Sequence, residues 1–138
     1  MTPQAEQYPF VAKDAALGPA GLLPLLPITL GFQQQTASVL GLLDTAAMVN
    51  VLPYDVGLQL GAVWEQQTTT VQLAGNLAQQ EARAILVFAA VGKFAPVRLA
   101  FAWTKSNEVP VLLGQVNFFM EFDVCFFRSR SVFEVKPK

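Results

Sequence analysis

The sequence predicts an all-β domain, a barrel or a sandwich, with at most two short helices. The first observation is that its apolar segments are short, about four to eight residues, and are bounded by turn residues. The second is the alternation of apolar with small or polar residues inside several of these segments. The third is the length of 138 residues, which fits one domain and contains no heptad pattern and no internal repeat.

The N-terminal half is expected to contain three strands. Residues 28–32 and 38–43 alternate as strands do, and the polar residues 33–36 between them predict a turn. A third strand, 48–52, should end at Pro53, because proline has no N–H to donate to a ladder. Ahead of them, residues 8–11 suit a short extended segment.

The C-terminal half continues this pattern of short elements. A helical turn is expected at 55–61, where Gly61 suits a C-terminal cap. Residues 68–73 are rich in β-branched side chains and predict a strand, with a turn at Gly75-Asn76 after it. The remaining expected elements are strands at 81–90, 97–103 and 109–113, a short helix at 116–122, and a hairpin of 123–127 with 132–135 around residues 128–130.

The composition excludes several classes of chemistry. The chain has 0 His and one cysteine, Cys125, so triads that need His, His-ligated zinc and Cys-rich metal sites are all excluded. An intrachain disulfide is impossible, and a net charge of -1 offers no basic surface for nucleic acid. An enzyme of this composition must use carboxylates, hydroxyls, lysine or a borrowed cofactor.

A membrane segment is not expected, although residues 15–43 contain no charge. Pro19, Pro24 and Pro27 interrupt this stretch, and residues 1–6 lack the positive charges of a secretory signal. We therefore predict a cytoplasmic protein without membrane contact. Residues 1–25 are expected to form an extended N-terminal segment, followed by one domain at 26–138.

Asp44 is the one acidic residue in the long apolar stretch 39–49. A carboxylate among apolar residues is costly unless it is paired or hydrogen-bonded, so its presence needs an explanation. As a simple alternative, Asp and Thr favour turns between strands.

The segment Leu42-Leu43-Asp44-Thr45-Ala46-Ala47 resembles the active-site loop of retropepsin-like aspartic peptidases, which reads apolar-apolar-Asp-Thr/Ser-Gly-Ala. Downstream, Leu112-Leu113-Gly114 resembles the apolar-apolar-Gly element beneath that loop. Residues 116–119 resemble the following helix, 122–124 resemble the last strand, and 71–85 occupy the place of the flap hairpin. The ordered resemblance covers about residues 26–136.

This resemblance implies a small closed β-barrel of the acid-protease type, assembled as a homodimer that cleaves a peptide or protein substrate. Asp44 is the implied catalytic residue, and no metal or organic cofactor is implied. Thr45 would hydrogen-bond across to its counterpart in the partner. The other implied site residues are Ala46 and Ala47 in the active-site loop, Leu73, Ala74, Gly75, Asn76 and Leu77 in the flap, and Leu112, Leu113 and Gly114 in the supporting element.

Two adjacent carboxylates suit peptide hydrolysis because they do not both ionise easily. Sharing one proton makes one carboxylate a base for water and the other an acid for the scissile carbonyl or amine. The chain contains one such loop, so a working site needs Asp44 from each of two chains. The apolar composition, 53%, is consistent with a hydrophobic dimer interface.

Two residues depart from the family pattern. Ala46 stands where the family has Gly. Two alternatives are open: its methyl group crowds the substrate strand or the opposite loop, or it is tolerated because the local φ is negative. Gln115 stands where the family often has Arg. A second hypothesis is therefore a catalytically silent dimerisation or peptide-binding module, and a third is a small all-β domain without peptidase kinship.

Overall fold

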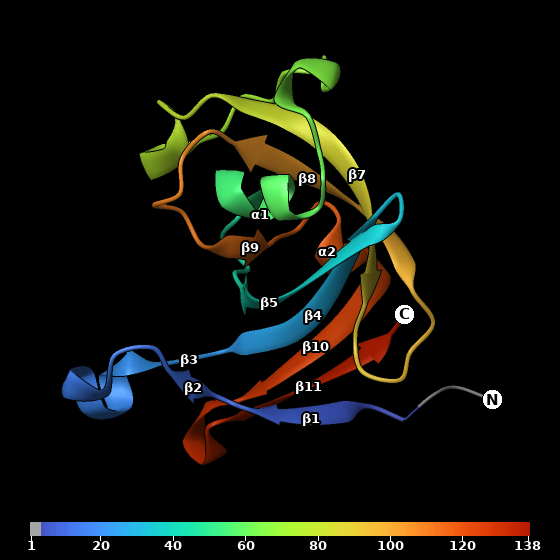
Figure 1. Ribbon diagram of the computed structural model, residues 1–138. Coiled ribbons are helices and arrows are strands. Elements are labelled where there is room, and N and C mark those ends of the chain that lie inside the picture. Colours follow the sequence, from blue (N-terminus) through green and yellow to red (C-terminus); the bar gives the residue numbers. More distant parts are fainter. Residues whose placement is uncertain (1–3) are drawn as a thin grey trace.

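The computed structural model describes residues 4–138, and its central feature is a closed β-barrel (Figure 1). The barrel strands follow the order β4-β5-β9-β6-β8-β7. This arrangement confirms the prediction of an all-β fold with a small closed barrel. The strand bounds are Leu25–Phe32 for β4, Gln35–Leu43 for β5, Asn50–Leu52 for β6, Ala82–Ala90 for β7, Val97–Thr104 for β8 and Val111–Leu113 for β9.

β4 and β5 form a long antiparallel hairpin with the predicted turn between them. Gln33 in this turn has a φ of 54°, the left-handed conformation that tight turns use. Both strands are longer than predicted, and β4 begins at Leu25 despite Pro27. Because β4 pairs with β7 only over Thr29–Gly31, the other side of Pro27 is unpaired, which is where strands tolerate proline.

Two parallel strand pairs close the middle of the barrel. β5 runs parallel to β9, and β6 runs parallel to β8 while meeting β9 in antiparallel orientation. Because β5 and β9 are parallel, both end on the same side, where Asp44 follows β5 and Gly114 follows β9. The topology thus brings two segments of the predicted site together.

A second sheet contains both ends of the described chain, in the order β1-β11-β10. β1 is Glu6–Pro9, β10 is Phe122–Phe127 and β11 is Val132–Pro137. The predicted C-terminal hairpin is confirmed, with the turn η4 at Arg128–Arg130. Figure 1 shows β11 lying between β1 and β10, beside the barrel.

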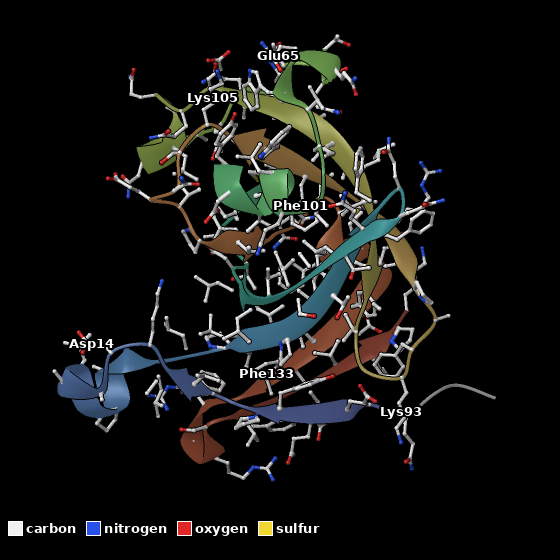
Figure 2. All side chains as sticks on the ribbon, viewed as in Figure 1. Asp14, Glu65, Lys93, Phe101, Lys105 and Phe133 are labelled. Carbon is white, nitrogen blue, oxygen red and sulfur yellow. The ribbon has the colours of Figure 1, made fainter. Side chains whose placement is uncertain are left out.

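The core fills the barrel and continues under the second sheet. Phe101 and Trp103 of β8 and Phe133 of β11 are at most 1% exposed. Charged side chains such as Asp14 and Lys105 lie at the periphery instead (Figure 2). A smaller apolar cluster lies beside the barrel mouth and consists of Val51, Leu73, Ala82, Ala102, Val109 and Leu112.

The two predicted helices are present but short, α1 at Tyr54–Gln59 and α2 at Phe118–Glu121. α1 packs directly on Trp103, whose indole N–H donates to the carbonyl of Tyr54 at 3.1 Å. A β-carbon at Gly57 would collide with that indole ring, so this glycine is required for the close approach. Nearby, η2 (Trp64–Gln66) stacks Trp64 edge-on against Trp103 at 5.2 Å.

The predicted strand at 68–73 is wrong. The structure has an isolated bridge, Thr70↔Arg83, and then the 3-10 turn η3 at Gly75–Leu77. The side-chain amide of Gln72 donates to the carbonyls of Leu73 (3.0 Å) and Ala78 (3.2 Å), which holds a compact loop. β-Branched residues favoured a strand, but local side-chain hydrogen bonds and burial of Leu73 outweigh that preference.

The described part of the N-terminal segment is not uniformly extended. After β1 it contains β2 (Val11–Ala12), η1 (Ala15–Gly21) and β3 (Leu22–Leu23), and β2 pairs with β3. The domain boundary at residue 25 stays a prediction. Within residues 4–138, each helix is too short or too polar to cross a membrane.

Candidate active site

Asp44 lies on a tight loop directly after β5. Its backbone N–H donates to the carbonyl of Leu113 at 3.0 Å, and its own carbonyl accepts from the N–H of Ala47 at 3.1 Å. The carboxylate atom Oδ1 accepts from the N–H of Ala46 at 3.0 Å. The side chain is half-buried, so it is oriented by the loop and still reaches the surface. This geometry is that of an Asx-turn, and the loop fixes the carboxylate without help from another side chain.

Ala46 fits this loop without backbone strain. Among residues 4–138, the non-glycine residues with positive φ are Gln33 and Ser131, so Ala46 has a negative φ. Its methyl group is exposed. The departure from the family's Gly is therefore compatible with the backbone of the single chain.

Gly114, by contrast, has no room for a side chain. A β-carbon there would lie 2.6 Å from the carbonyl oxygen of Val49 and 2.7 Å from that of Ala47. The chain after Gly114 is fastened to the loop, since the N–H of Gln115 donates to the carbonyl of Ala47 at 2.9 Å. Gly114 thus lies in close contact with the Asp44 loop.

Sequence reasoning missed a pair of amide side chains beneath the loop, the buried Asn50 and the half-buried Asn117. Asn50 is fully buried, and its Oδ1 accepts from the N–H of Gly114 at 2.8 Å. Its Nδ2 donates to the carbonyl of Ala100 (3.0 Å) and to Oδ1 of Asn117 (3.2 Å). The pair therefore ties β6, β8 and the segment after β9 to one another. A lone Asn inside the apolar stretch 48–52 was the available signal.

Gln115 contacts the same loop from outside. Its Nε2 donates to the carbonyl of Thr45 at 2.8 Å. Thr45 itself is exposed. The role predicted for its hydroxyl across a dimer axis stays a prediction.

A cavity of about 310 Å³ lies between the Asp44 loop and the segment predicted as a flap. Among the predicted flap residues, Asn76 alone does not line it, and no lining residue of this cavity in the described chain is charged. The structure therefore brings the loop, the flap candidates and the end of β9 together around one space. The lining residues are Ala46, Ala47, Met48, Val49, Val51, Gln72, Leu73, Ala74, Gly75, Leu77 and Leu112.

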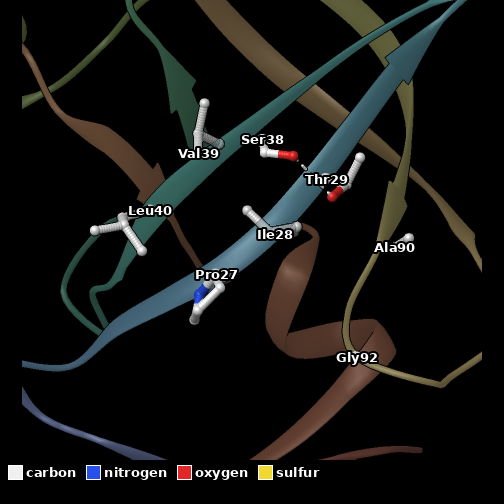
Figure 3. Close-up of a pocket in the computed structure, with 8 residues that line it drawn as sticks. All are labelled: Pro27, Ile28, Thr29, Ser38, Val39, Leu40, Ala90 and Gly92. Carbon is white, nitrogen blue, oxygen red and sulfur yellow. Dashed lines mark hydrogen bonds between the residues drawn. The ribbon is translucent and has the colours of Figure 1, made fainter.

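A larger hollow, of about 490 Å³, shares no lining residue with this cavity. It is formed by β4, β5 and the end of β7, and its polar groups include the hydroxyls of Thr29 and Ser38, 3.3 Å apart (Figure 3). It contains no predicted site residue and no acidic or basic side chain. Size therefore does not select the candidate site, and we place the candidate site at the smaller cavity because Ala46 and Ala47 of the Asp44 loop line it, although Asp44 itself does not.

The described chain offers no cluster of side chains that could bind a metal ion. Within residues 4–138 no group of three or more His, Cys, Asp or Glu side chains lies close enough to hold a metal ion. The carboxylate of Asp44 is thus the one ionisable group of the Asp44 loop.

No protein-family model matches the chain, and no curated protein sequence matches it. Among solved structures, the chain is similar to a retropepsin-like aspartic protease from Rickettsia conorii, with a TM-score of 0.61. The two share 14% sequence identity, and the comparison covers 97% of this chain and 92% of that one. At this identity the likeness concerns the fold, and it extends over nearly the whole of both chains.

Proposed function

We propose that the protein is an aspartic endopeptidase in which water is activated between the Asp44 carboxylates of a homodimer. The observation that carries the proposal is the position of Asp44. It follows a barrel strand on an anchored, solvent-reaching loop that contacts Gly114, and the next residues of that loop, Ala46 and Ala47, line a cavity together with flap candidates. The fold shared with a retropepsin-like protease adds support.

The chemistry needs two carboxylates because one group must take a proton while another gives one. Two such groups that lie close together share a single proton, and their titration then belongs to the pair. The deprotonated member takes a proton from water, and the protonated member donates to the scissile carbonyl or the leaving amine. Since the chain has one Asp44, the second carboxylate comes from a second copy around a two-fold axis.

The substrate is an extended peptide. It would lie across the cavity between Ala46–Ala47 and Leu73–Leu77, with its backbone hydrogen-bonded to the flanking segments. Thr45 would brace the two loops across the axis. The flap candidates are joined to the barrel through Thr70↔Arg83 and through the buried Leu73, which belongs to the apolar cluster of Val51 and Leu112, so this segment would have to leave that cluster to admit a peptide.

Replacing Asp44 with Asn tests the mechanism. The variant keeps the size of the side chain but cannot accept a proton, so cleavage of a mixed peptide pool should fall about 10²–10⁴-fold while the fold is retained. The exposed Asp55 provides a matched control, and Asp55→Asn should cleave like the parent. Cleavage by the parent should also stop with a transition-state-mimicking aspartic peptidase inhibitor. Equal cleavage by Asp44→Asn and the parent would refute the mechanism.

Ala46 is the observation that favours a second function, a catalytically silent peptide-binding module. Its methyl group is exposed beside the carboxylate, where it would meet a peptide or the partner's loop. If this reading is correct, the parent binds peptide or inhibitor without cleavage, and Ala46→Gly restores cleavage. Ala47→Gly, one residue along the same loop, should not restore it.

A further inference from the structure

Asn50 and Thr104 are the two polar side chains that are completely buried within residues 4–138. Burying a polar group is costly unless its donors and acceptors are paired, so each of the two needs a structural reason. Thr104 has a local one, since its hydroxyl contacts the carbonyls of Leu52 and Ser106 at the end of β8. Asn50 instead contacts β8 and the chain after β9, at least 50 residues away in sequence.

Residues 113–115, which we call the supporting segment, are bonded to the Asp44 loop at both of their ends. The carbonyl of Leu113 accepts from the N–H of Asp44 at 3.0 Å. The N–H of Gln115 donates to the carbonyl of Ala47 at 2.9 Å. These two bonds reach the beginning and the end of the loop, so the position of the supporting segment determines where the loop lies.

The middle residue of the supporting segment, Gly114, is held by Asn50. The buried N–H of Gly114 donates to Oδ1 of Asn50 at 2.8 Å. The backbone N–H of Asn50 also donates to the carbonyl of Val116 at 3.2 Å, just beyond the segment. Within residues 4–138, no other side chain is hydrogen-bonded to the backbone of the supporting segment. The segment is therefore bonded to the Asp44 loop through its ends and to Asn50 through its middle.

The orientation of the Asn50 amide is fixed by its other contacts. Its Nδ2 donates to the carbonyl of Ala100 at 3.0 Å and to Oδ1 of Asn117 at 3.2 Å. Oδ1 of Asn117 also accepts from the N–H of Ala100 at 3.0 Å. A flipped amide would set its oxygen against two acceptors and its nitrogen against the N–H of Gly114. The acceptor of Asn50 is thus aimed at Gly114 by two residues that lie outside the Asp44 loop.

We propose that Asn50 is a positioning residue for Asp44 and acts through Gly114. Its amide fixes the supporting segment relative to β8, and the segment in turn fixes both ends of the Asp44 loop. Asn50 does not line the cavity beside the loop, so it has no place for direct contact with a peptide there. The effect of Asn50 on the loop is independent of any activity, whereas its effect on cleavage rests on the proposed function.

The proposed chemistry makes the position of Asp44 critical. Two carboxylates must meet around one water and share one proton, and a displacement of about 1 Å can cost roughly a hundredfold in rate. Peptide binding depends instead on the residues that line the cavity. Loss of the Asn50 amide should therefore lower kcat and leave KM nearly unchanged.

Asn50→Leu tests the inference, because leucine has about the size of asparagine but leaves the buried N–H of Gly114 without its acceptor. Thr104→Val is the matched control, since it removes the other completely buried polar group. Amide hydrogen exchange is measured at Asp44 and Gln115 and divided by the rate of the β4 and β7 amides in the same sample, which corrects for overall stability. This ratio should rise at least roughly tenfold in Asn50→Leu and stay unchanged in Thr104→Val.

Cleavage kinetics provide a second readout, which a purely structural role would not move. Asn50→Leu should lower the kcat for a cleaved peptide about 10–100-fold and keep KM within about twofold of the parent. Thr104→Val should keep both constants. A parent that cleaves no peptide would refute the proposed function, and the exchange ratio would still decide the role of Asn50.

Asn117→Ala guards against misfolding of Asn50→Leu, which circular dichroism would reveal. It removes an acceptor that orients the Asn50 amide and keeps Asn50 itself, so the exchange ratio should rise about two- to tenfold. Equal ratios for Asn50→Leu and Thr104→Val would overturn the proposal. A parent-like ratio in Asn117→Ala, or a kcat of Asn50→Leu equal to that of an active parent, would overturn it as well.

Discussion

Near Asp44, the structure accommodates a methyl group at Ala46 but has no space for one at Gly114. Ala46 carries one on an exposed loop with a negative φ, whereas a β-carbon at Gly114 would be pressed against two carbonyl oxygens. The resemblance to the family marks both positions as glycine, and the structure separates them. Backbone crowding explains the glycine at 114, while at 46 any requirement for glycine must come from outside the chain.

Gly114→Ala should therefore destabilise the protein. The nearest carbonyl oxygens, of Val49 and Ala47, are backbone atoms that cannot move aside cheaply, so we expect a loss on the order of 1–3 kcal/mol. Urea unfolding measures it. Gly31→Ala is the control, because its new β-carbon would have neighbours no closer than 3.9 Å and should change stability little. Equal unfolding midpoints for the two variants would contradict the crowding at Gly114.

Tyr8 should make stability depend on pH in the alkaline range. Burial, with a 2.8 Å hydrogen bond to Glu6 and the negative charge of that carboxylate, raises the pKa of Tyr8 to about 12. The unfolded phenol ionises near pH 10, so between about pH 10 and about pH 12 the unfolded chain releases a proton that the folded chain retains. The contribution of Tyr8 is complete below about pH 10 and is lost as the pH rises towards 12.

The measurement compares the free energy of unfolding of the parent and of Tyr8→Phe across this range. Because phenylalanine has no ionisable group, the free energy of unfolding of Tyr8→Phe should fall less steeply with pH than that of the parent. Parallel curves would show that Tyr8 titrates alike in the folded and unfolded chains.

At the scale of elements, two features hold the segment between α1 and β7: the isolated bridge Thr70↔Arg83 and the side-chain hydrogen bonds of Gln72, which we call the clamp. Gln72 holds the loop closed through the carbonyls of Leu73 and Ala78. Gln72→Ala should free this loop, and hydrogen exchange of the amides at 71–80 should become faster while the barrel amides are unchanged. Gln79→Ala, an exposed residue of the same loop, is the matched control. If both variants exchange like the parent, the clamp does not hold the loop.

The same segment shows where sequence patterns were sufficient and where they were not. The hairpin of β4 with β5 and that of β10 with β11 follow from alternation and turn residues, which are local properties. The segment 68–73 has the same local character, but Leu73 is drawn into the cluster with Val51 and Leu112. The contact of Leu73 with these distant residues decided against a strand at 68–73, and a local sequence pattern carries no information about such a contact.

In the candidate site, too, some residues were predictable from the sequence and others were not. Asp44 was singled out because it stands alone in an apolar run, and Gly114 because its segment resembles the family's apolar-apolar-Gly element. Asn50 and Asn117 meet only when β6, β8 and the segment after β9 are brought together, and a single asparagine in a strand carries no sign of its partner. The parallel pairing of β5 with β9 was likewise not visible, since periodicity reports the faces of a strand and not its neighbours.

At the scale of the whole molecule, the N-terminal segment is built into the fold. Tyr8 and Phe10 pack on Phe133, with ring centroids 5.6 and 5.9 Å away, and β1 completes the second sheet. A chain of residues 26–138 should therefore be less stable than the full chain and melt at a lower temperature, because Phe133 would lose its cover. Calorimetry of both chains measures the difference. Equal melting temperatures would instead identify residue 25 as a true domain boundary.

The parallel pairing of β5 with β9 also bears on how the molecule folds. The hydrogen bond from Gln115 to Thr45 joins residues that are 70 apart in sequence, and the contact from Asn50 to Gly114 spans 64. Closing loops of this length has an entropic cost before any contact forms, so such contacts belong to the late, slow part of folding. We expect the local hairpins to form first and the setting of Asp44 to appear only as the barrel closes. A nascent or partly folded chain would then contain Asp44 before the barrel segments that surround its carboxylate are in place.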